Sequence, residues 1–247
     1  MKKLIIFAGL TAVIVWTTSC APTATVTSGG GPDIAAAQAE RYDGPKARLA
    51  VGNFEDRTAS GSISSYWMGN YGIAWKQIGD GMRNMLTTAL FNTNRYIVLE
   101  REQLDEVLKE QDLGAEGRIK KGTEAPVGEI YGADLIITAA VTEFAGDMKG
   151  LKGETKVLGV NVGGGVGKAH MALDIRIIDA KTSQIVASAS VEGSASNIGL
   201  SGQGDIGPLP VSLAGFSNTP VEKAIRVCIQ KAGEYIVSKT PKEYYRR

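Results

Sequence analysis

Two stretches of alternating apolar and small residues, between residues 139 and 217, constrain the fold of this chain more than any other feature. In the segment 158–163 (Leu-Gly-Val-Asn-Val-Gly) every second residue is apolar, and the residues between are Gly or Asn. A strand with this pattern has one apolar face and one small, polar face. Each limb approaches the roughly 9–11 residues that a tilted strand needs to cross a bilayer. Four limbs from one chain leave sheet edges exposed to lipid, so the pattern predicts a barrel shared by several copies.

The predicted transmembrane hairpins span residues 141–168 and 185–217. Their alternation assigns these side chains to the lipid-facing surface: Phe144, Leu158, Val160, Val162, Leu209, Val211 and Leu213. Segments so rich in Gly and Ser would make a poor soluble core, which favours the membrane interpretation. A soluble extension of a sheet, or flexible loops, is the alternative.

The first residues of the chain resemble a targeting segment. Lys2 and Lys3 precede the apolar run 4–16, which ends in small residues before Cys20. This arrangement is typical of a secretory signal peptide, and the run is too short for a comfortable transmembrane helix. A Cys at this place predicts a bacterial lipoprotein, with a signal peptide over 1–19 and a lipidated Cys20 that begins a low-complexity tether over 20–46. An ordinary signal peptide with a chance Cys is the alternative.

Residues 47–140, 169–184 and 218–247 are predicted to form one periplasmic α/β domain. Apolar spacing indicates strands at 47–51, 96–99, 134–138 and 173–179 and helices at 73–91 and 101–108, with a polar loop over 53–65 and a helical segment near 129–131. Thr219 and Pro220 are typical of a helix start, and this last helix should run to about Ser238. Because strands and helices interleave, an α/β sandwich is expected. Cys228, on the apolar side of the last helix, should be a buried structural thiol.

Four segments, taken in order, resemble the CsgG family of outer-membrane lipoproteins that secrete curli subunits. They are 95–101 (Arg-Tyr-Ile-Val-Leu-Glu-Arg), 132–136 (Gly-Ala-Asp-Leu-Ile), 174–179 (Asp-Ile-Arg-Ile-Ile-Asp) and 218–221 (Asn-Thr-Pro-Val). The resemblance implies a nonameric ring of periplasmic α/β domains, in which each subunit gives two hairpins to a shared thirty-six-stranded barrel. The expected fold class is therefore an α/β periplasmic domain with two transmembrane β-hairpins in a shared oligomeric β-barrel.

The resemblance also implies a pore constriction between the first strand and the first long helix. Tyr66, Asn70 and Tyr71 have the spacing of the family's constriction residues, with Tyr71 where the family has Phe. A ring of aromatic faces and neutral amides would make weak, repeated contacts with an unfolded chain without trapping a charge. The alternative is that these side chains are buried or interfacial aromatics on a loop.

Several classes of function are unfavourable for this sequence. A net charge of +1 without a basic stripe argues against nucleic-acid binding. His170 is the only histidine, which excludes His-containing triads and most zinc sites. The Gly-rich segment 202–207 matches a dinucleotide fingerprint by letter, but Pro208 and Pro210 follow where a helix should open. We therefore expect no enzyme, no metal and no cofactor beyond the covalent lipid, which would include palmitate, on Cys20.

The leading expectation is an outer-membrane lipoprotein that forms an oligomeric channel, independent of ATP, for unfolded curli-type amyloid subunits. Its expected partners are further copies of itself, the unfolded secreted polypeptide, the membrane, and periplasmic and extracellular accessory proteins. The alternative is an outer-membrane-anchored periplasmic binding lipoprotein without a pore, similar to activators of peptidoglycan synthases. A nucleotide-binding enzyme is a third hypothesis, which requires a dinucleotide near Gly202.

Overall fold

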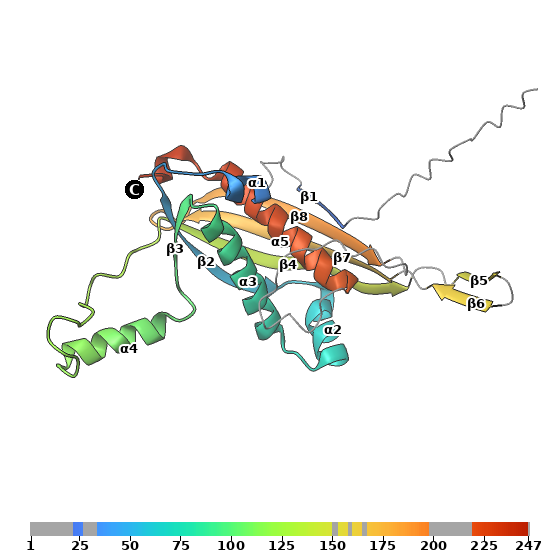
Figure 1. Cartoon of the computed structure of the whole chain (residues 1–247), viewed down its shortest axis with the longest axis horizontal. Coiled ribbons are helices and arrows are strands. Elements are labelled where there is room, and N and C mark those ends of the chain that lie inside the picture. Colours follow the sequence, from blue (N-terminus) through green and yellow to red (C-terminus); the bar gives the residue numbers. More distant parts are fainter. Residues whose placement is uncertain are drawn as a thin grey trace, which may run out of the picture.

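The computed structural model describes residues 22–26, 34–149, 153–157, 160–164, 167–197 and 219–246 (Figure 1). Its strands are β1 (Thr23–Val26), β2 (Ala47–Asp56), β3 (Tyr96–Leu99), β4 (Leu135–Lys149), β5 (Gly153–Val157), β6 (Val160–Gly164), β7 (Gly167–Asp179) and β8 (Ile185–Asn197). Its α-helices are α1 (Ile34–Ala39), α2 (Ser62–Tyr71), α3 (Trp75–Asn92), α4 (Leu104–Ala115) and α5 (Pro220–Lys239), and the short 3-10 helices are η1 (Ala59–Gly61) and η3 (Lys242–Tyr244). None of the helices in this part of the chain combines the length and the apolar character needed to cross a bilayer.

Six strands form one mixed sheet in the order β1-β8-β7-β4-β2-β3. β2 pairs in parallel with both β3 and β4, whereas β4, β7, β8 and β1 pair antiparallel with one another. β5 and β6 pair with each other in a separate two-stranded sheet. The long strands β8, β7 and β4 therefore form the middle of the six-stranded sheet.

Helices α3 and α5 lie on one face of the six-stranded sheet (Figure 1). They are amphipathic, and their apolar faces pack on alternate residues of the strands, which places the core between the two layers. Its largest fully buried members include Leu49, Ile78, Met82, Leu86, Ile137, Leu173 and Ile175. α4 lies apart from the sheet, at the end of a long excursion between β3 and β4 (Figure 1).

The predicted fold class, with two transmembrane hairpins in a shared barrel, is wrong. β4 and β8, which were expected to supply hairpin limbs, are both paired with β7 within the same sheet that α3 and α5 cover. In β8, which belongs to the predicted hairpin over 185–217, Ala189, Val191 and Ala195 are buried on the side that α5 covers. Gly193 is small because the helix is close: a Cβ there would lie 2.4 Å from the Sγ of Cys228. The alternation therefore reflects helix packing on a sheet rather than contact with lipid.

Other expectations can be compared directly with the described elements. β3 and α5 begin at the predicted residues, and the Thr219 side chain accepts a hydrogen bond from the Glu222 N–H over 3.2 Å as a helix N-cap. Residues 129–131 are not helical, and part of the expected polar loop over 53–65 belongs instead to β2 and α2. The left-handed Gly128, at φ +93°, is one reason why no helix forms near 129.

Part of the segment expected to be a tether packs on the body of the protein. β1 extends the sheet along β8, and Val26 packs against the core. Ile34 and Ala37 of α1 are buried, and the Ile34 side chain lies in contact range of Gly233 on α5. The chain is therefore held to the folded domain from residue 23 onward at two separate places.

Candidate functional site

The candidate site is an aromatic cluster, formed by Tyr66, Trp67 and Tyr71 of α2 together with Phe144 of β4. Tyr66 is its centre, with ring centroids 5.1 Å from Phe144, 5.6 Å from Trp67 and 6.0 Å from Tyr71. Most of these contacts are edge-to-face, the arrangement that the quadrupoles of aromatic rings favour. Trp67 is buried and anchors the helix, whereas Tyr71 is 39% exposed. The cluster therefore has a fixed base and an accessible rim.

Helix α2 is fixed at its start by Asp56, the last residue of β2. Its carboxylate accepts hydrogen bonds from the N–H and hydroxyl of Thr58, at 2.9 and 2.5 Å, and from the N–H and hydroxyl of Ser64. Burial opposes ionisation of Asp56, but these hydrogen bonds outweigh it and lower its pKa. At the other end, the left-handed Gly72 stops the helix, and its N–H donates to the Met68 carbonyl over 3.0 Å.

Gly146 allows the cluster to reach β4. A Cβ at this position would lie 2.8 Å from Cε2 of Tyr66 and 2.9 Å from Cζ of Phe144, so any larger residue would displace a ring. Tyr66 thus lies directly over the backbone of β4 where this strand continues beyond the core. The aromatic cluster is in this way attached to the end of the sheet.

The structure brings together the three predicted constriction residues, but on a helix rather than a loop. Tyr66 and Asn70 are one turn apart on α2, and Asn70 Nδ2 donates to the Tyr66 carbonyl over 2.9 Å. Asn70 and Tyr71 are exposed. Sequence reasoning missed the helix because Ser, Gly and Asn are common in it; its signal was the aromatic pair Trp67 and Tyr71, four residues apart between two glycines.

The other predicted site residues are less completely described. Phe144 belongs to the aromatic cluster, and Val160 and Val162 lie in β6, paired with Val157 and Thr155 of β5. Four predicted positions and the lipidation site lie outside the described residues: Leu158, Leu209, Val211, Leu213 and Cys20. The assignment of a pore constriction and of lipid attachment thus stays a prediction.

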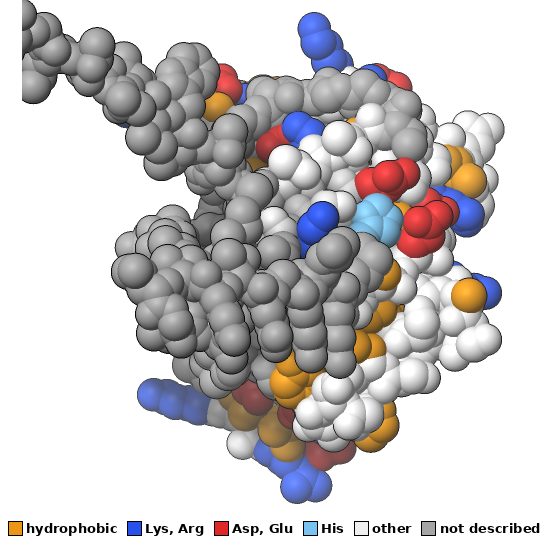
Figure 2. All heavy atoms as spheres, turned by 90° about the vertical axis from the view of Figure 1, so that its right-hand side faces the viewer, with side chains coloured by type: hydrophobic (Ala, Val, Ile, Leu, Met, Phe, Trp, Pro, Cys, Tyr) orange, Lys and Arg blue, Asp and Glu red, His pale blue; other side chains and the backbone are white. Residues whose placement is uncertain are grey.

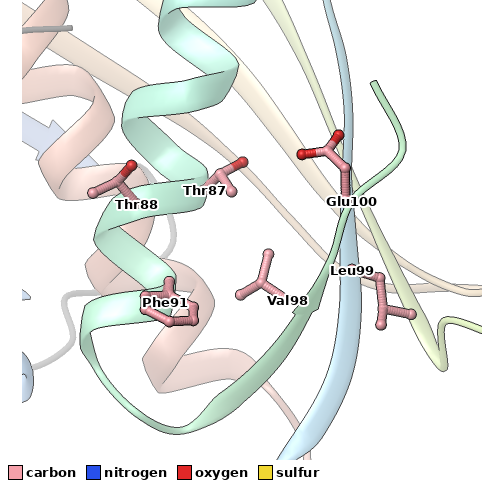
Figure 3. Close-up of a pocket in the computed structure, with 6 residues that line it drawn as sticks. All are labelled: Thr87, Thr88, Phe91, Val98, Leu99 and Glu100. Carbon is pink, nitrogen blue, oxygen red and sulfur yellow. The ribbon is translucent and has the colours of Figure 1, made fainter. Parts of the chain in front are cut away.

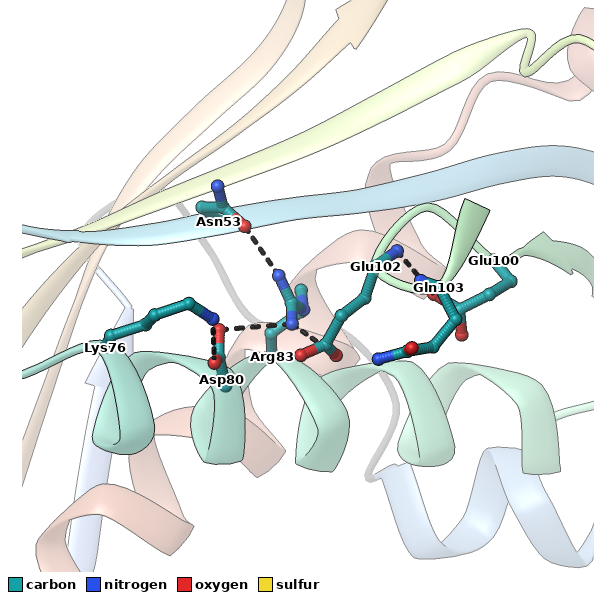
Figure 4. A network of polar contacts seen from close by, with 7 residues as sticks. All are labelled: Asn53, Lys76, Asp80, Arg83, Glu100, Glu102 and Gln103. Carbon is teal, nitrogen blue, oxygen red and sulfur yellow. Dashed lines mark hydrogen bonds and ion pairs between the residues drawn. The ribbon is translucent and has the colours of Figure 1, made fainter. Parts of the chain in front are cut away.

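A polar network that the sequence did not predict connects β2, α3 and the start of α4 (Figure 4). Arg83, whose side chain is 8% exposed, donates to Asn53 Oδ1 over 2.5 Å and pairs with Asp80 and Glu102. Glu100 accepts hydrogen bonds from the N–H groups of Glu102 and Gln103. Glu102 lies before α4 and neutralises the nearly buried guanidinium of Arg83. Because Arg83 is paired with two carboxylates and Glu100 is held by backbone N–H groups, we assign the network a structural role.

Two concave surfaces lie elsewhere on the described part of the chain. A small pocket of 180 Å³ lies between α3 and the edge strand β3, lined by Thr87, Thr88, Phe91, Val98, Leu99 and Glu100 (Figure 3). A larger groove of 760 Å³ lies over β2, β4 and β7, and its charged lining residues are Glu55, Arg57, Asp174 and Arg176. Its balanced charge and shallow polar lining suit a protein surface better than a small ligand.

The remaining reactive side chains form no catalytic arrangement that we recognise. His170 lies 3.1 Å from Ser194 Oγ and 3.4 Å from Glu143 Oε2, across neighbouring strands of an open sheet surface. Cys228 is buried as predicted, and this burial raises the pKa of its thiol to about 12, which makes it unreactive. Within the described ranges, no three His, Cys, Asp or Glu side chains are grouped so that they could hold a metal ion.

Comparison with known proteins identifies the family. The family model described as "Curli production assembly/transport component CsgG" matches residues 34–244, which include the whole six-stranded sheet except β1. The chain belongs to the CsgG family. The resemblance seen in the four sequence segments is thereby confirmed.

A relative of known sequence is named "Putative lipoprotein NMB1126/NMB1164", from Neisseria meningitidis serogroup B. It is 28% identical over 153 residues, which are 62% of this chain. The matched part covers 60% of the relative's length, so this chain spans less than two thirds of the relative.

Solved structures with a similar arrangement include lipoprotein GNA1162 of Neisseria meningitidis, with a TM-score of 0.32 and 14% identity over 64% of this chain and 87% of the other. The C-terminal domain of LpoB from Salmonella enterica has a TM-score of 0.31 and 16% identity, over 65% and 92% of the two chains. A PelC dodecamer from Paraburkholderia phytofirmans has a TM-score of 0.31 and 13% identity, over 73% and 86%. At these scores the likenesses carry no argument about function.

Proposed function

We propose that this CsgG-family protein is a cell-envelope lipoprotein, anchored to the outer membrane through acyl chains on Cys20. In the proposal it assembles into a homo-oligomeric channel that passes unfolded curli-type subunits out of the periplasm, without catalysis and without a cofactor other than the lipid. The family match over residues 34–244 is the observation that carries this proposal. The family resemblance gives nine as the expected number of subunits, and periplasmic and extracellular accessory proteins as further partners.

The aromatic cluster provides a physical reason for contact with an unfolded chain. Tyr71 and Asn70 present an accessible ring and a neutral amide, while buried Trp67 keeps the helix in place. Repeated around a ring of copies, such groups would bind a passing polypeptide weakly at many points, which favours entry without preventing release. A rigid base under an exposed contact residue also lowers the entropy cost of each contact.

A secretion assay tests the proposal in cells that produce the full lipoprotein and a tagged, unfolded reporter of curli type. We expect the reporter in the medium only when the lipoprotein is present, and ring-shaped particles when the lipoprotein is extracted in detergent and imaged. Tyr71→Ala should reduce secretion several-fold while leaving the rings intact. Tyr131→Ala, which removes an exposed Tyr from the excursion after α4, is the control and should secrete normally.

A second candidate, a binding lipoprotein without a pore, is favoured by one observation. The groove over β2, β4 and β7 is large, polar and open, as expected of a surface that receives a partner protein. On this hypothesis the protein is monomeric after extraction, and it binds a purified peptidoglycan synthase and stimulates it. Monomers that secrete no reporter would therefore contradict the channel and favour this alternative.

A further inference from the structure

The groove over β2, β4 and β7 lies on the face of the sheet opposite the core. Ile137, Leu173 and Ile175 are buried on the core side, so the residues that alternate with them point to the opposite face. His170 belongs to this opposite face as well, and Figure 2 shows acidic and basic side chains beside the histidine. An antiparallel sheet often has one solvated face, so the shape and the charges of the groove have to decide whether it is a site.

The groove follows β4 along its length. Its floor consists of the small side chains of Thr138, Ala140 and Thr142 on β4, and its walls are longer side chains of β7 on one side and of β2 and the residue after it on the other. The three floor residues span about 14 Å along the strand, and each wall strand lies about 4.8 Å from β4. The groove therefore has the length of several residues of an extended polypeptide chain.

Four charged side chains surround Ala140 in an approximately two-fold arrangement. Glu55 on β2 and Asp174 on β7 both pair directly with Ala140, so one row places a carboxylate on each side of the floor. Arg176 lies two residues from Asp174 toward the start of β4, and Arg57 lies two residues from Glu55 toward its end. The groove thus presents two carboxylates at its centre and one guanidinium at each end.

The charges on the β7 wall have no partner in the part of the chain that the structure describes. Neither Asp174 nor Arg176 forms an ion pair or a side-chain hydrogen bond there. On the other wall, Arg57 pairs with Glu55 over 2.6 Å, but the two side chains are 68% and 57% exposed. An ion pair this exposed contributes little to stability and can be exchanged for ion pairs with a ligand.

We propose that the groove binds an extended segment of the unfolded polypeptide, with a basic side chain over Ala140 between the two carboxylates. Acidic side chains two residues to either side of it then lie at Arg176 and Arg57. The spacing supports this occupant, because side chains on one face of an extended chain repeat about every 6.8 Å, which is also the separation of Asp174 and Arg176 along β7. The origin of the polypeptide, a secreted chain, rests on the proposed function.

A second copy of the same sheet face would fit the groove poorly. A two-fold axis parallel to β4 would place the carboxylate of one copy opposite a carboxylate of the other, which costs electrostatic free energy. A chain in transit also needs contacts that are weak and reversible, as exposed ion pairs are. Such contacts are screened by salt, so binding should weaken between about 50 and 500 mM salt.

The experiment measures peptide binding to the full lipoprotein in detergent by fluorescence anisotropy. The probe is a labelled seven-residue peptide of Gly and Ser with a central Lys and a Glu two positions to either side. One comparison peptide has the same composition with its three charged residues adjacent, and another exchanges Lys and Glu throughout. We expect the probe to bind about tenfold more tightly than either comparison peptide, as three correctly placed exposed ion pairs would give.

Variants of the groove test the assignment of the charges. Asp174→Asn combined with Arg176→Gln should abolish the preference, whereas Asp105→Asn combined with Arg118→Gln, which removes exposed charges from the excursion around α4, should leave it unchanged. A variant that inverts all four charges should instead prefer the exchanged peptide: Glu55→Arg, Arg57→Glu, Asp174→Arg and Arg176→Glu. Circular dichroism establishes that each variant is folded; Arg176→Gln alone, at an exposed position, should weaken binding of the probe and keeps the test decisive.

Equal binding of the three peptides to the native protein would overturn the site, and so would a preference that the groove variants do not change. Secretion of the reporter without peptide selectivity would leave the proposed channel intact while rejecting the groove as a binding site. Peptide selectivity without secretion would support the site but overturn the secreted chain as its occupant. The failure of the site and the failure of the proposed function are therefore distinguishable.

Discussion

The two ends of the six-stranded sheet are stabilised in different ways. We call the end where β4 and β8 finish the near end, and the end at the turn between β7 and β8 the far end. At the near end, close packing dominates: Tyr66 lies over Gly146, and α5 lies on Gly193 so closely that an added side chain must displace its neighbours. At the far end, hydrogen bonds dominate: Asp179 accepts from the N–H groups of Lys181 and Thr182 and from the Tyr244 hydroxyl, over 2.8, 2.6 and 2.6 Å. The comparison indicates that the near end is sensitive to side-chain volume, and the far end to protonation.

The same comparison bears on function. At the far end, the C-terminal residues lie on the turn between β7 and β8, so the contacts there attach the end of the described chain to the sheet. The near end gathers the aromatic cluster, the first residues of the sheet and the N-terminus of α5, where Pro220 lies beside Gly167. The side of the molecule that carries the candidate site is therefore also the side on which the first described strand begins.

A substitution at Gly193 should have the largest effect. Gly193→Leu forces a side chain into the Sγ of Cys228 and the Ala224 carbonyl, which lie 2.4 and 2.9 Å from the ideal Cβ. We expect a loss of about 3 kcal/mol in the free energy of unfolding, measured by urea denaturation. Gly69→Ala is the control, because nothing lies within 4 Å of its Cβ on α2. It should stabilise the helix by about 0.5–1 kcal/mol. Equal effects of the two substitutions on the free energy of unfolding would contradict the proposal that close packing dominates at Gly193.

Loss of the helix cap at the near end should have an intermediate effect. Thr219→Ala removes the hydroxyl that accepts from the Glu222 N–H, and it should lower the free energy of unfolding by about 1 kcal/mol. Thr219→Ser keeps the acceptor and should retain most of the stability. A difference of less than about 0.3 kcal/mol between Ala and Ser would show that the cap is not formed.

Protonation at the far end should have the smallest effect. The hydrogen bond from Tyr244, with those from Thr182 and Lys181, lowers the pKa of Asp179 to about 2, from its usual 3.8. A lowered pKa in the folded state means that the contribution to stability is complete above pH 3.8 and is lost as the pH falls toward 2. The hydrogen bond to Asp179 raises the pKa of Tyr244 to about 12, so this contribution is also lost above pH 10.

The measurement is the dependence of the thermal unfolding midpoint on pH, between pH 5 and pH 2.5. Tyr244→Phe should flatten this dependence, because it removes the strongest of the interactions that lower the pKa of Asp179. Tyr245→Phe, which alters the neighbouring ring without touching Asp179, should leave the dependence as it is. Identical profiles for the native protein and Tyr244→Phe would contradict the account of the far end.

The sequence predicted those elements whose signals are local. The apolar spacing of α3, the short apolar run of β3 and the cap at Thr219 each contain their own evidence, and each lies where it was expected to within two residues. Buried Cys228 followed from its position between Ile225 and Ile229 on the apolar side of α5. These features depend on periodicity and caps, which are determined within a few residues.

Prediction from the sequence was wrong where the structure depends on which other element packs against a strand. Alternating small and apolar residues in β8 are compatible with lipid on one side, but also with a helix that lies close to the strand. The helix that covers them, α5, follows more than twenty residues later, so no local pattern could connect Gly193 with Cys228. The aromatic residues of α2 were recognised, but their helix was not, because its start depends on Asp56 at the end of a different element.

The central claim, that β8 packs under α5, is tested most directly by a disulfide. Gly193→Cys places a second thiol in direct contact with Cys228, because an ideal Cβ there lies 2.4 Å from its Sγ, while Ser194→Cys places it on the opposite face of the strand. The membrane-anchored protein is mildly oxidised, denatured and then alkylated. We expect Gly193→Cys to show no free thiol and no dimer, and Ser194→Cys to show both thiols. Free, alkylatable thiols in Gly193→Cys would show that this strand does not pack against the helix, and would contradict the account.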